Sequence, residues 1–324
     1  MNASRRYAAV DFVKALAIVG VVVQHAGPNL FGVQASLFEQ LLRQKLFAFH
    51  VPSFLIVSGF LYCRSAPAPW REVGRRLNRI VVPYLVASAV VVLLGFSPVK
   101  SPENLAFRVA TGGTMALYYF IWLLAVFVVL IWPFSRMSRR ALLLLLALLC
   151  TYSVISAFYP ELRLTHATYW TFRNPIHHVG YFLTGWLAAL YLGELRAFVD
   201  RHRALVWGLC ALGIFAWLAT TGTRLPGQSI GLVRTAYTLS VVTAVVLLTR
   251  TLHVSALVRV LSESSLTIYL YHPAVILALL PALRGTPPAL HIPLLTAVGL
   301  ALPIALALLA RRSLGSRSKL LVGA

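Results

Sequence analysis

Long apolar runs separated by short polar segments make up most of the chain. A helix that crosses a membrane needs about 20 consecutive, mostly apolar residues. Ten stretches come close to that length: 9–30, 45–63, 79–97, 114–132, 141–158, 174–192, 204–221, 230–249, 263–281 and 292–310. The pattern predicts an all-α, multi-pass membrane protein of about ten transmembrane helices.

The composition excludes a water-soluble protein of this size. Of the 324 residues, 59% are hydrophobic and 11% are charged, whereas a soluble domain carries about 25% charged residues. No polar segment between the apolar runs is long enough to fold alone. We therefore expect a single transmembrane domain over residues 1–324, with a basic cytoplasmic tail at about 311–324.

The formal net charge is +21, which in a soluble protein would indicate nucleic-acid binding. Here the basic residues lie in short segments between apolar runs, where they are typical of topology signals, so no nucleic-acid partner is expected. With a cytoplasmic N-terminus and ten spans, the cytoplasmic side carries 19 Lys and Arg residues and the outer side carries 9. This bias predicts that both termini are cytoplasmic.

The first predicted span contains three ionisable residues, Asp11, Lys14 and His25. Lys14 and His25 are eleven positions apart, so a helix places them on one face with a separation of about 16 Å. Asp11 and Lys14 have the spacing of a helical ion pair. Because charge inside a membrane is costly, this face is expected to contact protein or water rather than lipid.

His25 has two interpretations. An imidazole exchanges protons near neutral pH, so His25 could act as a catalytic base in an aqueous cavity. It could instead be a helix-packing histidine beside a stabilising Lys–Asp pair. The residue types alone leave both readings open.

Two further histidines are expected at a similar depth. His50 begins the second span from the outer side, and His272 lies in the outer half of the ninth. Pro273 frees a backbone carbonyl one turn before it, which could contact a ligand or only mark a kink. A structural role for His50 is also open. Three histidines could hold a metal, but metal-ligand spacing is absent from the sequence, and none is expected.

Arg75, Arg76 and Arg79 lie at the predicted cytoplasmic end of the third span, in "WREVGRRLNRIVVPY". Arg76 and Arg79 share a helix face. Two guanidinium groups in this arrangement can grip phosphates bidentately. The other reading is anchoring of the span to anionic lipid headgroups.

Together these segments resemble the membrane-bound acyltransferase-3 family, the bacterial carbohydrate O-acyltransferases. Lys14 to His25 is similar to its Arg/Lys-x10-His pattern, and "FHVPSFLIVSGF" to its second-span segment. Arg76 and Arg79 resemble its Arg-x-x-Arg element. "GYFLTGWLAALY" resembles its sixth-span pattern, and "LSESSLTIYLYHPAVI" its near-terminal segment. The similarity covers essentially the whole chain. Lys14 departs from the commoner Arg, and Thr267 stands where a small residue or Tyr is frequent.

The resemblance implies a ten-span enzyme of the bacterial inner membrane. Such an enzyme transfers an acyl group, usually acetyl, from cytoplasmic acyl-CoA to a hydroxyl of an extracytoplasmic carbohydrate, such as an exopolysaccharide or O-antigen. Acyl-CoA is the donor substrate, and the carbohydrate is the acceptor. The acceptor's identity, the acyl chain length and the oligomeric state cannot be read from the sequence.

Site roles follow from the residues and the resemblance together. The catalytic candidates are His25, Lys14 and Asp11. The candidates for holding the phosphates of coenzyme A are Arg75, Arg76 and Arg79. The candidates for binding the acceptor or stabilising an oxyanion are His50, His272 and Arg173. Direct transfer and an acyl-histidine intermediate both remain open.

Two other classes of function compete with the enzyme. Intramembrane Asp, Lys and His residues also suit a proton-coupled transporter or a flippase for a glycan or lipid precursor. No internal repeat is visible in the sequence, which weakens that reading. The third reading is a structural subunit of a polysaccharide-export complex, for which His25 would be dispensable.

Overall fold

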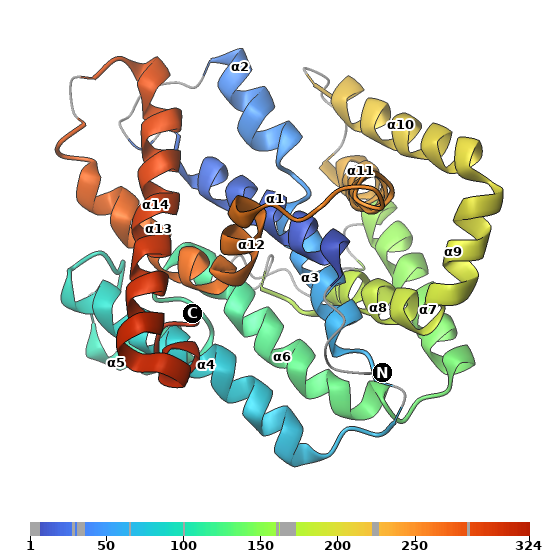
Figure 1. Cartoon of the computed structure of the whole chain (residues 1–324), viewed down its shortest axis with the longest axis horizontal. Helices are drawn as coiled ribbons and strands as arrows, with labels where there is room; N and C mark the ends of the chain where they lie inside the picture. The colour runs from blue at the N-terminus through green and yellow to red at the C-terminus, as the bar shows by residue number, and fades with distance from the viewer. Residues whose placement is uncertain are drawn as a thin grey trace. The chain divides into compact units, whose positions relative to one another are not determined.

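The computed structural model describes residues 7–27, 30, 36–64, 66–99, 101–159, 162, 173–221, 227–283 and 286–324. Every regular element in these ranges is a helix (Figure 1). The helices are α1 (Ala8–His25), α2 (Leu37–Gln40), η2 (Leu41–Leu46), α3 (His50–Tyr62), α4 (Trp70–Leu93), α5 (Pro102–Ala110), η3 (Ala116–Tyr118), α6 (Tyr119–Phe134), α7 (Arg139–Phe158), α8 (Ile176–Leu190), α9 (Leu192–Arg201), α10 (Arg203–Ala219), α11 (Gly227–Leu248), α12 (Ala256–Glu263), α13 (Ser265–Leu279), α14 (Pro288–Leu314), η5 (Gly315–Arg317) and α15 (Ser318–Leu321).

Helices long and apolar enough to cross a membrane confirm the predicted class, an all-α multi-pass membrane protein. Within the described ranges seven segments qualify: Ala8–His25, Leu37–Tyr62, Trp70–Leu93, Ala116–Phe134, Arg139–Phe158, Gly231–Leu248 and Ala289–Leu321. The bent pair α8 and α9 can supply an eighth, and α10 and α13 are shorter apolar helices. Each predicted stretch thus contains a helix, while the count of ten and the side of the termini stay predictions.

Several helix ends differ from the predicted spans, and two of these differences bear on the candidate site. α4 begins at Trp70, nine residues before the predicted start at position 79, so Arg75, Arg76 and Arg79 lie within the helix. α1 ends at His25, five residues before the predicted end at position 30. The sequence continues as Gly27-Pro28 there, and proline disfavours helical geometry in the residue that precedes it.

The chain forms two compact units, which are described separately. Unit 1 consists of Met1–Lys14, Ala48–Val73 and Phe127–Val254. Unit 2 consists of Ala15–Phe47, Gly74–Val126 and Ser255–Ala324. The single domain over residues 1–324 remains a prediction.

In unit 1 the helices α3 and α8 pack against each other at two glycines. A Cβ atom on Gly59 would lie 1.8 Å from the carbonyl oxygen of Phe182, and one on Gly185 would lie 1.8 Å from that of Ile56. Small residues allow such close backbone approach between membrane helices. The buried side chain of Phe182 packs against the ring of Phe127 beside this crossing.

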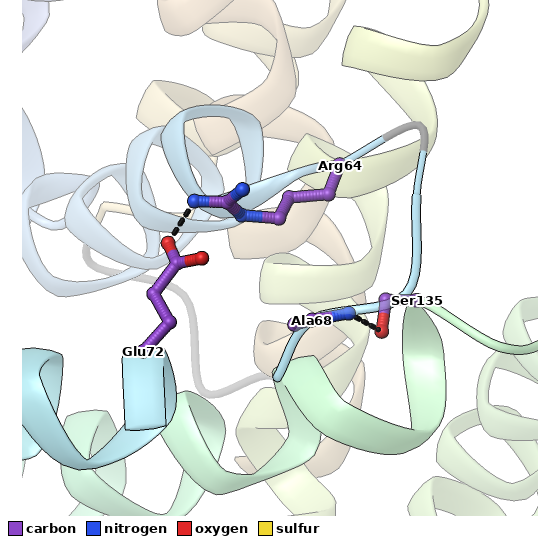
Figure 2. Close-up of polar contacts among 4 residues, drawn as sticks. All are labelled: Arg64, Ala68, Glu72 and Ser135. Atoms are coloured by element: carbon purple, nitrogen blue, oxygen red, sulfur yellow. Dashed lines mark hydrogen bonds and ion pairs between the residues drawn. The ribbon is translucent and has the colours of Figure 1, made fainter. Parts of the chain in front are cut away.

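Polar contacts tie the connection between α3 and α4 to the end of α6, also within unit 1. Figure 2 shows Arg64 paired with Glu72, and the backbone N–H of Ala68 donating to Ser135 Oγ at 2.9 Å. Arg136 donates to the carbonyl of Ala68 at 3.2 Å. These bonds hold this connection against the last turn of α6.

In unit 2, α13 packs along α14. Hydrogen bonds join α13 to the short helix η3. The hydroxyl of Tyr118 donates to the carbonyl of Leu270, and the hydroxyl of Tyr269 donates to the carbonyl of Leu117. Both tyrosines are buried. A buried hydroxyl needs a partner, so these two reciprocal bonds fix α13 at the level of Leu270, two residues before His272.

Candidate functional site

His25 occupies the last turn of α1. Its Nδ1 lies 2.7 Å from the carbonyl oxygen of Val21, one turn earlier. A carbonyl oxygen only accepts hydrogen bonds, so Nδ1 must carry the proton. In the neutral ring the lone pair then resides on Nε2, and the helix itself selects the tautomer in which Nε2 can accept a proton.

His272 lies in α13 and is completely buried. Its Nδ1 is 2.8 Å from the carbonyl oxygen of Ile268, so it repeats the bond made by His25. The same argument places the proton on Nδ1 and the lone pair on Nε2. The ring of Tyr269, with its centroid 6.3 Å away, flanks it.

The two imidazoles, 247 positions apart in the sequence, are neighbours in unit 2. Their ring centroids are 5.3 Å apart, and the planes are inclined by 53°. In the neutral form each ring carries its lone pair on Nε2, the nitrogen that does not face the helix carbonyl. One ring can therefore take a proton from a substrate hydroxyl while the other orients a polar substrate atom.

Arg43 also lies beside this part of α1, and in the sequence it is only one of the nine positive charges predicted on the outer side. It lies on the π-helix η2 and donates from Nε and Nη2 to the carbonyl oxygen of Gln24, at 3.1 and 2.7 Å. Gln24 precedes His25 in the chain. No spacing or motif in the sequence connects Arg43 with α1, because their contact depends on how η2 packs beside the end of α1.

Four predicted site residues belong to unit 1: Asp11, Lys14, His50 and Arg173. Asp11 and Arg173 are buried, whereas Lys14 and His50 are half-buried. Asp11 and Lys14 share α1 with His25, so their spacing along one helix face is as predicted. Their roles, and those of His50 and Arg173, stay predictions.

The three candidate phosphate-binding arginines lie in the first three turns of α4, in unit 2. Arg75 and Arg79 are exposed and Arg76 is half-exposed. On a helix the separations of three and four residues place Arg79 beside both of the others. The arrangement can present several guanidinium donors to one polyphosphate.

In the part of the chain that the structure describes, no group of three or more His, Cys, Asp or Glu side chains could hold a metal ion.

Comparison with known proteins identifies the family. A family model described as an acyltransferase domain, acyltransferase-3, matches residues 7–308. The searches of curated proteins and of solved structures gave no match. The matched range includes α1 with His25, α4 with its arginines and α13 with His272. Because the match covers most of its length, the chain belongs to the acyltransferase-3 family.

Proposed function

We propose that this acyltransferase moves an acyl group, acetyl by the family's usual choice, from cytoplasmic acyl-CoA to a hydroxyl of an extracytoplasmic carbohydrate. Family membership supports acyl transfer in general. The observation that carries the chemical proposal is the Nδ1 bond of His25, which leaves Nε2 as a proton acceptor beside a second imidazole.

In the direct route, Nε2 of His25 takes the proton of the acceptor hydroxyl as its oxygen attacks the thioester carbonyl. The carbon–sulfur bond breaks, and the departing sulfur of coenzyme A takes the proton from His25. His272 orients the acceptor or the carbonyl oxygen. In the second route His25 carries the acyl group before the hydroxyl takes it. Both routes end in the same ester and free coenzyme A.

The donor is proposed to be held through its phosphates by Arg75, Arg76 and Arg79. Charge-assisted hydrogen bonds from guanidinium to phosphate are about twice as strong as neutral ones. The thioester must still reach His25, which helix geometry places about 16 Å from the level of Lys14. The long, thin pantetheine arm of coenzyme A suits such a path along the polar face of α1.

The test uses membrane vesicles with their cytoplasmic face outward and acetyl-CoA labelled in the acetyl group. We expect label to enter the glycan fraction as an alkali-labile ester. The double variant Arg76→Gln/Arg79→Gln is expected to raise KM for acetyl-CoA by roughly tenfold or more, because each lost charge-assisted bond costs about 1.5–3 kcal/mol. The exposed pair Arg312 and Arg317, changed in the same way, is the control for loss of two positive charges.

The buried carboxylate of Asp11 in a candidate span favours a second reading, a proton-coupled carrier. Uptake of a glycan precursor that follows the proton gradient and needs no acyl donor would establish the carrier. Label transfer that persists without a proton gradient would exclude it.

An unchanged KM in the arginine variant would refute the proposed donor site but not acyl transfer itself.

A further inference from the structure

A side chain from another helix caps the last turn of α1. The final carbonyls of a helix have no helical N–H to accept from. The carbonyl of Gln24 is one of these, and Arg43 donates to it with two N–H groups, from Nε and Nη2. The guanidinium therefore caps the backbone carbonyl of the residue that precedes His25.

The backbone beyond His25 leaves room for that guanidinium. A Cβ atom on Gly27 would lie 1.8 Å from Nη1 of Arg43 and 2.0 Å from its Cζ. Any larger residue at position 27 must therefore displace Arg43 or the end of α1.

The segment that carries Arg43 is itself unusual. It is a π-helix of six residues, Leu41–Leu46, a rare geometry that frequently marks functional sites. A second contact joins it to α1, because a Cβ on Gly20 would lie 2.6 Å from Cδ1 of Phe47. Gly20 in α1 and Gly27 just after it thus receive side chains from the short segment 43–47.

We propose that Arg43 is a positioning residue for acyl transfer, which fixes the C-terminal turn of α1 and so the Nε2 atom of His25. The proposal rests on the proposed function of His25. Arg43 acts through the Gln24 carbonyl and not on the substrate, so its loss changes the catalytic step and not donor affinity. Misplacement of a catalytic group by about 1 Å can cost roughly 100-fold in rate.

The first experiment compares Arg43→Lys with wild type in the vesicle assay. Lysine keeps the positive charge but cannot direct two parallel N–H groups at one carbonyl. We expect kcat to fall roughly 10- to 100-fold while KM for acetyl-CoA stays unchanged. Lys45→Gln, two residues further along the same π-helix, is the matched control and should keep wild-type kcat.

A second variant leaves Arg43 in place. Gly27→Ala is expected to lower kcat in the same way, because its methyl group meets the guanidinium. In an Arg43→Ala background the same change should add little, since the colliding group is gone. Such non-additivity is the expected sign of two residues acting through one contact.

The outcomes separate this inference from the proposed function. A folded Arg43→Lys enzyme with wild-type kcat, a KM that rises with the fall in kcat, or additive effects of Gly27→Ala and Arg43→Ala would each overturn the positioning role. An active His25→Ala enzyme would overturn the proposed catalytic role of His25, on which this inference rests. An inactive His25 variant beside a fully active Arg43→Lys variant would overturn only the inference drawn here.

Discussion

Replacing His25 with glutamine is expected to lower kcat for acyl transfer by roughly 10²- to 10⁴-fold, the usual contribution of a general base. Glutamine retains a hydrogen-bonding side chain on the same turn of α1, but it cannot take a proton from a hydroxyl. KM for acetyl-CoA should stay within about twofold of wild type, because the proposed donor contacts are on α4. Labelled-acetyl transfer into glycan, measured in vesicles with equal amounts of inserted protein, checks both values.

His253 provides the matched control. It is an exposed histidine between α11 and α12, and His253→Gln should transfer acetyl groups at the wild-type rate. A correctly inserted His25→Gln protein with wild-type kcat would contradict the proposed base. If the acyl group passes through His25, wild-type protein mixed with labelled donor and no acceptor should carry a label that hydroxylamine releases and that His25→Gln lacks.

Introducing a single methyl group at the crossing of α3 and α8 is expected to destabilise the fold of unit 1 strongly. In Gly185→Ala the new Cβ would stand 1.8 Å from the carbonyl oxygen of Ile56, a backbone atom that no side-chain rotation can move. The two helices must separate and lose their packing, at a cost of roughly 3 kcal/mol or more. The fraction of monodisperse protein after mild detergent extraction, followed by size-exclusion chromatography, measures the loss.

Gly180→Ala, five residues earlier in α8, tests whether the effect belongs to the crossing. A Cβ there meets nothing within 4 Å, so the variant should be as stable as wild type or slightly more so. Recovery of monodisperse Gly185→Ala protein at the level of Gly180→Ala would show that the close approach is not required for folding.

The apolar pattern predicts where the helices lie better than where they end. The stretch predicted at 79–97 belongs to α4, which starts at Trp70, because helical geometry continues into a charged segment that no hydropathy window includes. The π-helix before α3 is equally invisible, since its residues fit an α-helix as well as a π-helix. Helix ends are set by local hydrogen bonds, such as that of Arg43, rather than by apolarity.

For the candidate site, the sequence suggests the participants but not their contacts. His25 and His272 are expected at similar depth, and the structure brings their rings together. Arg43 could not be found, because its only sequence feature is a positive charge outside the apolar run. The predicted roles of Asp11 and Lys14 depend on groups around α1 that spacing along one helix cannot identify.

The bend of 83° between α8 and α9 bears on how unit 1 sits in its lipid. If α8 alone crosses the bilayer along its normal, we expect α9 to lie near the plane of the headgroups, where the exposed Leu195 and Phe198 can face the acyl chains and the exposed Arg196 the phosphates. Sliding α8 along the membrane normal would bury that arginine or hydrate those apolar side chains. The depth of α8, and of α3 packed on it, is therefore expected to follow the headgroup level of one leaflet when lipid tail length changes.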